Sequence, residues 1–214
     1  EILTVSDLLY HRPHRYLDYS NRAKIASLRP GEITTVSGTI VESKNVYTRT
    51  RKAIQKLKLE DDTGVLEATW FNQPYLTGSL KVGARVNLSG EINKTGFRME
   101  MTSPEYELAR VDGAKTIHTG RLVPVYPETQ GVSSKWLRSR IAPLIELILP
   151  DLPDWLPDSI REKEILITLN RAIRDLHFPE SLREVEQSVK RLSFDEMFLL
   201  QLTTFFRKAA WNKQ

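Results

Sequence analysis

The sequence contains no cysteine. That absence excludes disulfide bonds, thiol nucleophiles, iron–sulfur clusters and the usual structural zinc sites. No apolar run approaches the ~18–20 residues that a transmembrane helix needs, because the best candidate, residues 142–149, is short and holds a proline and a glutamate. A phosphate-binding G-x-x-x-x-G-K-S/T loop and an H-E-x-x-H zinc motif are also missing, and the four histidines are scattered. The sequence therefore predicts no catalytic residues, no metal site and no membrane contact.

The composition is that of an ordinary folded domain. Of 214 residues, 40% are hydrophobic and 27% are charged, which is typical of globular proteins and fits one or two domains. The net charge of +4 is compatible with nucleic-acid binding, but a slightly basic globular domain explains the total equally well. Because the chain begins at Glu1 rather than at methionine, we expect a fragment or a processed product.

A β pattern in the first half of the chain predicts a small barrel. Apolar residues indicate five strands, with a polar, proline-containing interruption between the third and the fourth; the expected strands are 36–46, 54–59, 65–71, 85–92 and 97–102. This layout matches an oligonucleotide/oligosaccharide-binding (OB) barrel, and Gly38 would let the long first strand bend. An SH3-like barrel is the main alternative, although it usually lacks the interruption.

The remainder of the chain flanks this barrel. We expect an N-terminal arm with a short helix over residues 1–32, the barrel domain over 33–108, an extended linker over 109–132 and a helical region over 133–214. The predicted fold class is thus α+β: a five-stranded Greek-key OB barrel with an N-terminal arm and a helical C-terminal extension.

Capping patterns predict where several helices begin. Thr4 and Asp7 have the spacing of a capping box ahead of the short first helix, and Thr168 can cap a helix that Pro179 ends. Ser193 and Glu196 form another capping box, so we expect the last helix to begin there and to reach about residue 210.

The connection between the first two expected strands is basic. No acid lies between Glu42 and Glu60. In OB folds this connection borders the binding face and follows a nucleic-acid backbone. The alternative is a solvated hairpin tip, where cations prevent edge pairing, and charge alone does not decide between the two. The candidate binding residues are Lys44, Tyr47, Arg49, Arg51, Lys52 and Lys56.

An aromatic segment follows the third expected strand. Strand alternation places Trp70 and Phe71 on opposite faces, so that only one can point into the barrel, and Tyr75 follows past a proline. Two aromatic rings at the rim, Phe71 and Tyr75, could stack on unpaired bases, at ~1–3 kcal/mol each. The alternative is that both close the barrel mouth as part of the core.

Several phrases of the sequence resemble the RecG family in their order and spacing. The resemblance runs from about residue 3 to about residue 210, although Arg12 and His14 depart from the usual form of the first phrase. The phrases that carry it are Leu9–Tyr16, Leu28–Glu32, Trp70–Leu76, Pro104–Glu107, Pro124–Pro127 and His177–Glu180.

The resemblance implies a function. RecG proteins are bacterial ATP-dependent DNA helicases that remodel stalled forks and drive branch migration, and this region corresponds to their wedge domain, which splits strands at a branched junction. The resemblance implies that Phe71 and Tyr75 stack on bases at the junction and that the basic connection holds a strand. It also implies a monomer of the bacterial cytoplasm, associated with the nucleoid, that binds branched and single-stranded DNA. ATP and magnesium would belong to motor domains absent from this chain, so the fragment itself would hold no cofactor and would not be an enzyme.

Two alternatives to a DNA-binding wedge stay open at this point. OB barrels also bind peptides, so the barrel could be a protein-interaction module that docks a single-strand-binding protein at forks. A stand-alone enzyme is the other alternative, against which the missing nucleophile, metal ligands and phosphate loop argue.

Overall fold

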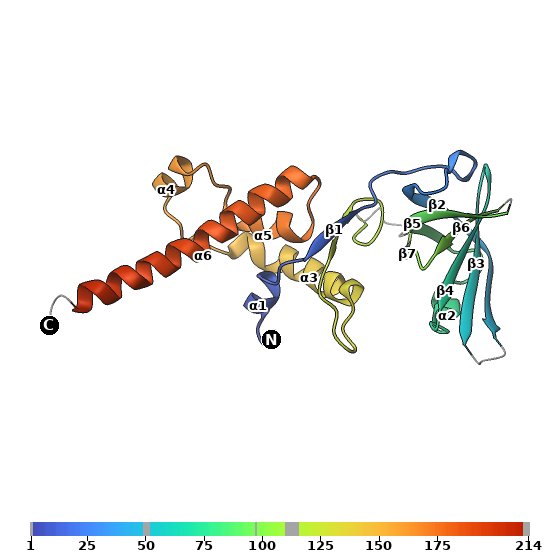
Figure 1. Cartoon of the computed structure of the whole chain (residues 1–214), viewed down its shortest axis with the longest axis horizontal. Coiled ribbons are helices and arrows are strands. Elements are labelled where there is room, and N and C mark those ends of the chain that lie inside the picture. The colour runs from blue at the N-terminus through green and yellow to red at the C-terminus, as the bar shows by residue number, and fades with distance from the viewer. Residues whose placement is uncertain (1, 49–51, 97, 110–115, 212–214) are drawn as a thin grey trace. The chain divides into compact units, whose positions relative to one another are not determined.

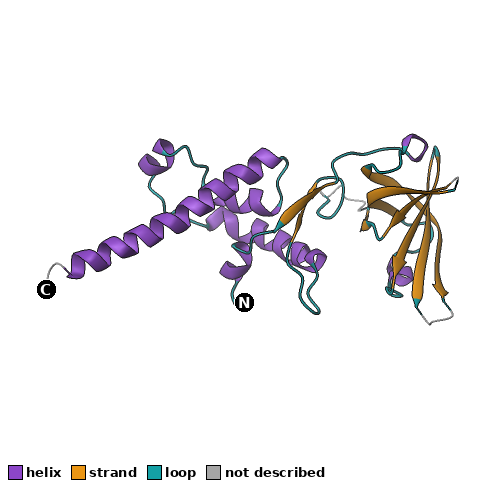
Figure 2. Cartoon of the chain, viewed as in Figure 1, coloured by secondary structure: helices purple, strands orange, loops and turns teal. Residues whose placement is uncertain are grey.

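The computed structural model describes residues 2–48, 52–96, 98–109 and 116–211 (Figure 1). The chain divides into two compact units, one over Leu17–Val123 and one that joins Glu1–Tyr16 to Pro124–Gln214. The first unit contains most of the strands and the second most of the helices (Figure 2). The finer boundaries expected at residues 32, 108 and 132 stay a prediction.

Five strands of the first unit close into a barrel. Hydrogen bonds join them in the order β2-β3-β4-β6-β5, and β5 also pairs with β2. Every pairing in this circuit is antiparallel except that of β4 with β6, which is parallel. This is the Greek-key circuit of an OB barrel, so the predicted fold class is confirmed and the SH3-like alternative is wrong. The strands are β2 (Ile33–Tyr47), β3 (Ala53–Asp61), β4 (Gly64–Phe71), β5 (Arg85–Thr95) and β6 (Arg98–Thr102).

Two further elements complete this unit. The expected interruption after the third strand contains a short helix, α2 (Leu76–Ser79), and a strand that the sequence did not predict, β7 (Glu105–Leu108), pairs with β5. A 3-10 turn, η1 (Ile25–Ser27), precedes β2. Both Leu76 and Ile25 are buried in the core of the barrel, so these elements close it with apolar side chains.

Gly38 lies where β2 changes partner. Residues up to Thr39 pair with β5 and residues from Thr39 onward pair with β3. A Cβ atom at Gly38 would lie 2.5 Å from the carbonyl oxygen of Glu60, which no ordinary side chain tolerates. A glycine is therefore needed because the backbone of β3 approaches closely at the bend, which adds a steric cause to the expected flexibility.

The second unit is helical apart from residues 15–16 of β1 (Arg15–Asp18) and residues 124–125 of β8 (Leu122–Val125), two strands that pair with each other. Apolar side chains from all its larger helices form one core around the fully buried Tyr126. In the described ranges, none of the helices combines the length and the apolar character that a membrane span requires. The helical elements are α1 (Val5–Leu9), α3 (Ser134–Ile148), η2 (Leu149–Asp151), α4 (Asp158–Lys163), α5 (Leu169–His177) and α6 (Leu182–Trp211).

Two of the three predicted helix starts are confirmed. Thr4 and Asp7 form a reciprocal capping box at α1, and the Thr168 hydroxyl accepts a hydrogen bond from the first turn of α5. The start predicted at Ser193 is wrong, because α6 begins at Leu182 and passes through Ser193 without interruption. The turns before Ser193 stay helical because Arg191, wholly buried, binds the Asp154 carboxylate through two hydrogen bonds of 2.9 and 2.6 Å.

A buried histidine joins three segments of the helical unit. The His177 ring lies with Nε2 2.7 Å from the carbonyl oxygen of Leu9 and with Nδ1 2.6 Å from the Tyr126 hydroxyl. Since a carbonyl can only accept, Nε2 carries the proton and Nδ1 accepts from the tyrosine. Burial of the neutral ring lowers the pKa of His177 to about 4.

Candidate nucleic-acid interface

The side chains that point outward from β2, β3 and β4 form a three-by-three grid, which we call the outer face. Cross-strand register aligns its rows, each of which takes one residue from β2, one from β3 and one from β4. The first row is apolar, the second carries two lysines, and the third is ionic. The rows are Val46–Ile54–Phe71, Lys44–Lys56–Thr69 and Glu42–Lys58–Glu67.

A β-bulge puts the β2 side chains on this face. Between Ile40 and Glu42, β2 takes two steps while β3 takes one, from Leu59 to Lys58. Ile40 points into the core, so strict alternation would have sent Glu42 inward as well. The bulge reverses the alternation, and all three β2 members of the outer face therefore point outward.

Phe71 stands at one end of the outer face. It is the last residue of β4, its ring is 50% exposed, and it lies opposite Ile54 of β3. Its neighbour Trp70 points into the barrel, where it is 3% exposed and its indole N–H donates to the carbonyl oxygen of Pro104 at 2.9 Å. The predicted division of the two rings between opposite faces is confirmed.

Tyr75 follows after a tight turn. Asn72 adopts a left-handed backbone conformation (φ 56°), and its N–H donates to the Ala53 carbonyl oxygen at 2.8 Å. The Tyr75 ring is 63% exposed, and its hydroxyl donates to Gln73 Oε1 at 2.9 Å. Both candidate rings are thus exposed, so the alternative that both close the barrel mouth as core is wrong. Their role in binding DNA stays a prediction.

A chain of side-chain amides, which the sequence reasoning missed, holds the turn between the two rings. Gln55 of β3 is 2% exposed, and its Oε1 accepts from the backbone N–H of Gln73 at 2.9 Å. Its Nε2 donates to Asn45 Oδ1 at 3.0 Å, and Asn45 Nδ2 donates to Thr77 Oγ1 at 2.9 Å. The signal in the sequence was a glutamine at an inward position between Ala53 and Leu57.

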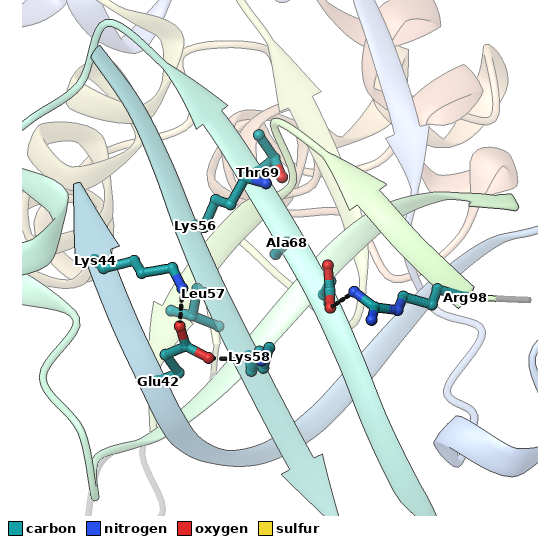
Figure 3. A pocket seen from close by; sticks show the side chains of 9 residues that line it. Glu42, Lys44, Lys56, Leu57, Lys58, Ala68, Thr69 and Arg98 are labelled. Atoms are coloured by element: carbon teal, nitrogen blue, oxygen red, sulfur yellow. Dashed lines mark hydrogen bonds and ion pairs between the residues drawn. The ribbon is translucent and has the colours of Figure 1, made fainter. Parts of the chain in front are cut away.

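The cations of the outer face are mostly paired. Glu42 binds Lys44 through one carboxylate oxygen and Lys58 through the other, the latter at 2.7 Å (Figure 3). These two ammonium groups lower the pKa of Glu42 to about 2. Arg98 of β6 pairs with Glu67 at 3.0 Å. Together with Lys56 and Thr69, these side chains line a shallow hollow of about 110 Å³. The sequence reasoning did not include Glu42, Lys58, Glu67 or Arg98.

The other predicted binding residues that the structure describes, Tyr47 and Lys52, lie outside the three-by-three grid. Tyr47, 66% exposed, ends β2 on the side of the hairpin that carries Asn45. Lys52 is exposed just before β3, where its backbone N–H donates to Thr48 Oγ1 at 3.0 Å. The predicted binding residues Arg49 and Arg51 lie outside the described residues. The structure therefore brings Lys44, Lys56 and Phe71 onto one face and leaves Tyr47 and Lys52 at the hairpin end.

By its strand order, this unit belongs to the OB class. In OB folds the second and third strands of the barrel, which are β3 and β4 here, form the usual ligand surface. The outer face includes both of these strands. Across the described ranges, no group of three or more metal-ligating side chains lies together. A sequence model of the family described as the RecG wedge domain matches residues 1–148. The chain therefore belongs to the RecG wedge domain family.

Comparisons with individual relatives support the same family. The chain is 32% identical to the ATP-dependent DNA helicase RecG of Synechocystis, a match that covers 100% of this chain and 27% of the relative. It is 30% identical to the ATP-dependent DNA helicase RecG of Thermotoga maritima, and this match covers 94% of this chain and 26% of the relative. Among solved structures, a RecG protein bound to a three-way DNA junction superposes with a TM-score of 0.74 at 29% identity, covering 97% of this chain and 28% of that one. The chain thus spans about a quarter of the length of the relatives it matches.

Proposed function

We propose that this chain is the junction-binding wedge of a RecG-type ATP-dependent DNA helicase. In this proposal the OB barrel binds branched DNA, such as a replication fork or a Holliday junction, and separates strands at the branch during fork reversal and branch migration in repair and recombination. The observation that carries the proposal is the pair of exposed rings, Phe71 and Tyr75, which a buried amide chain holds beside a cationic face.

Stacking supplies the physical reason for junction preference. A base inside a duplex is already stacked on its neighbours, whereas an unpaired base at a branch gains ~1–3 kcal/mol on an aromatic ring. Phe71 sits on a hydrogen-bonded strand and the turn before Tyr75 is tied to the barrel interior. Little conformational freedom is lost when such rings meet a base, and the rings can resist the pull of the strands that re-anneal.

Cations supply the remainder of the binding energy in this proposal. Lys44 and Lys56 on the outer face, and Tyr47 and Lys52 at the hairpin end, would contact the phosphates and sugar edges of one strand. We propose the same role for Arg49 and Arg51, which the sequence analysis added to this set. Each phosphate that is neutralised releases condensed counterions, so binding weakens as salt is added.

ATP hydrolysis belongs elsewhere in this proposal. The matched relatives are named ATP-dependent helicases, and the present sequence has no phosphate-binding loop. We therefore assign ATP and magnesium to motor domains outside this chain, and we assign to this chain DNA binding without catalysis. We also propose, from the family resemblance, that the protein acts as a monomer in the bacterial cytoplasm, near the nucleoid.

The test compares the affinity of the chain for a three-way fork, a plain duplex and a single strand at two salt concentrations. The fork should bind most tightly, and the Phe71→Ala/Tyr75→Ala variant should lose that preference. Phe205→Ala/Phe206→Ala removes two equally exposed rings from α6 and should leave the preference intact. Equal binding of all three DNAs by the unaltered chain would contradict the proposal.

A protein partner is the second candidate. The apolar row Val46–Ile54–Phe71 on the outer face could seat a proline-rich tail of a single-strand-binding protein. Competition between such a tail peptide and fork DNA separates the two candidates, since a peptide that binds without displacing DNA occupies another surface.

A further inference from the structure

The ionic row of the outer face contains two carboxylates in a surface that otherwise suits phosphate. We propose that Glu42, with Glu67, is an internal phosphate mimic: each carboxylate occupies cations that line the hollow in the free protein and is displaced when DNA phosphates arrive. This inference rests on the proposed function, because it assumes that the outer face binds DNA. It assigns to the two glutamates a role in specificity: they weaken the phosphate contacts that the face makes with any DNA strand, whether or not the DNA is branched.

The geometry of Glu42 supports the proposal. Its two carboxylate oxygens bind the ammonium groups of Lys44, on its own strand, and of Lys58, on the neighbouring strand. Figure 3 shows dashed lines from this carboxylate to both lysines. Two cations that converge on one pair of anionic oxygens form the arrangement that a bridging phosphate would also accept.

Glu67, which also lines the hollow, binds a single cation. Its carboxylate pairs with Arg98, whose side chain is 75% exposed. A guanidinium in solvent exchanges one oxyanion for another at little cost, because exposed ion pairs are individually weak. Planar guanidinium groups also suit phosphate, so Arg98 is free to change partner when a strand is present.

Lys56 is the side chain from which exchange would begin. It occupies the middle of the grid, between Lys44 and Thr69, and it has no carboxylate partner within the described ranges. A phosphate held first by Lys56 would lie beside Lys44 in the same row and one row from Lys58, and it would compete with Glu42 for both lysines.

The two carboxylates set the balance of charge around the hollow. Lys44, Lys56, Lys58 and Arg98 oppose Glu42 and Glu67, so half of the cationic charge is neutralised before DNA binds. Phosphate contacts are independent of sequence and of branching. Lowering their share of the binding energy leaves a larger share to base stacking on the exposed rings, which depends on unpaired bases.

The test is the affinity of Glu42→Gln for a fluorescent oligothymidylate of about 16 nucleotides, the upper site size of one OB fold. Removing the mimic should tighten binding about fivefold at ~50 mM salt, the effect of one nearby surface charge. The slope of log K against log salt should steepen by up to about 0.7, one single-strand phosphate. Glu67→Gln should act in the same direction.

Glu91→Gln is the matched control. It removes the same charge from an exposed position on β5 that is not part of the hollow, so it measures the effect of net charge alone. If Glu42→Gln and Glu67→Gln tighten binding no more than Glu91→Gln, the inference is overturned. Thermal unfolding of each variant checks that the barrel is intact.

This outcome is separate from that of the proposed function. The proposed function predicts a ratio of fork affinity to single-strand affinity, whereas the inference predicts a change in single-strand affinity on removal of a carboxylate. The unaltered chain could lack fork preference while its Glu42→Gln variant binds oligothymidylate more tightly. That result would contradict the proposed function and support the inference about the glutamates.

Discussion

The buried side chain of Gln55 accepts a hydrogen bond from the backbone N–H of Gln73 at 2.9 Å. This bond joins the interior of the barrel to the turn that separates Phe71 from Tyr75. The same glutamine donates to Asn45, so one side chain ties together the first hairpin and the aromatic segment. The exposed rings are therefore positioned by a polar residue that itself has almost no contact with solvent.

Replacing Gln55 by leucine should uncouple the turn from the barrel. The N–H of Gln73 and the amide oxygen of Asn45 would lose partners. Fully buried polar groups without partners cost ~1–3 kcal/mol each, and these two groups are partly buried, so we expect a loss at or below the lower end of that range for each. We expect a lower free energy of unfolding in urea and a reduced preference for fork DNA. Gln201→Leu, at an exposed position on α6, should change neither quantity. Full fork preference in Gln55→Leu would show that the turn holds its shape unaided.

At Tyr75 the ring should matter and the hydroxyl should not. Tyr75→Phe loses only a solvent-exposed hydrogen bond to Gln73, so fork affinity should stay within about twofold of the unaltered chain. Tyr75→Ala loses base stacking of ~1–3 kcal/mol, which is about five- to 150-fold in affinity. Fluorescence anisotropy with a labelled fork measures both. Equal losses in the two variants would show that the hydroxyl, rather than the ring, contacts DNA.

Removing the charge of Lys56 should weaken every DNA form alike. Lys56→Gln should lower affinity for fork, duplex and single strand and reduce the single-strand salt slope by about 0.7, one phosphate contact. Lys81→Gln, an exposed lysine outside the hollow, provides the matched control. An unchanged slope in Lys56→Gln would remove this lysine from the interface.

The buried His177 should make folding depend on pH. Its pKa is about 4 in the folded chain and 6.5 when exposed, so between these values the unfolded state binds a proton that the folded state does not. The free energy of unfolding should therefore fall as pH decreases from 6.5 to 4, by roughly 3 kcal/mol in total.

Urea unfolding across this pH range tests the prediction by difference. His177→Gln should lose this part of the pH dependence, whatever its absolute stability, while carboxylates that titrate in the same range contribute equally to both proteins. His14→Gln, at an exposed position, should retain the profile of the unaltered chain. A His177→Gln profile parallel to that of the unaltered chain would mean that the ring is accessible to protons.

Local patterns were enough to predict the barrel. Alternating apolar residues and turn signals located five strands, because each strand must bury one face and each turn needs special backbone conformations. The opposite placement of Trp70 and Phe71 followed from alternation within a single strand. The caps at Thr4 and Thr168 were predictable since the hydrogen bonds of a cap involve residues only three apart.

Tertiary contacts decided what the local patterns left open. Ser193 has a capping signature, yet α6 continues through it because the buried Arg191 is bound to Asp154, distant in sequence. The expected role of the basic hairpin rested on charge, and only the folded chain showed which carboxylates take up those charges.

The sequence by itself determined the class of fold, the placement of Trp70 and Phe71 on opposite faces of their strand and the basic character of the first hairpin, because each depends on neighbours along the chain. Only the tertiary structure decided the outer face. One bulged residue between Ile40 and Glu42 reverses which side chains of β2 point outward, and alternation cannot reveal it. Cross-strand register then brings Glu42 to Lys58 and Gln55 to Asn45, since side chains meet across a sheet according to hydrogen-bond pairing and not according to their order in the chain.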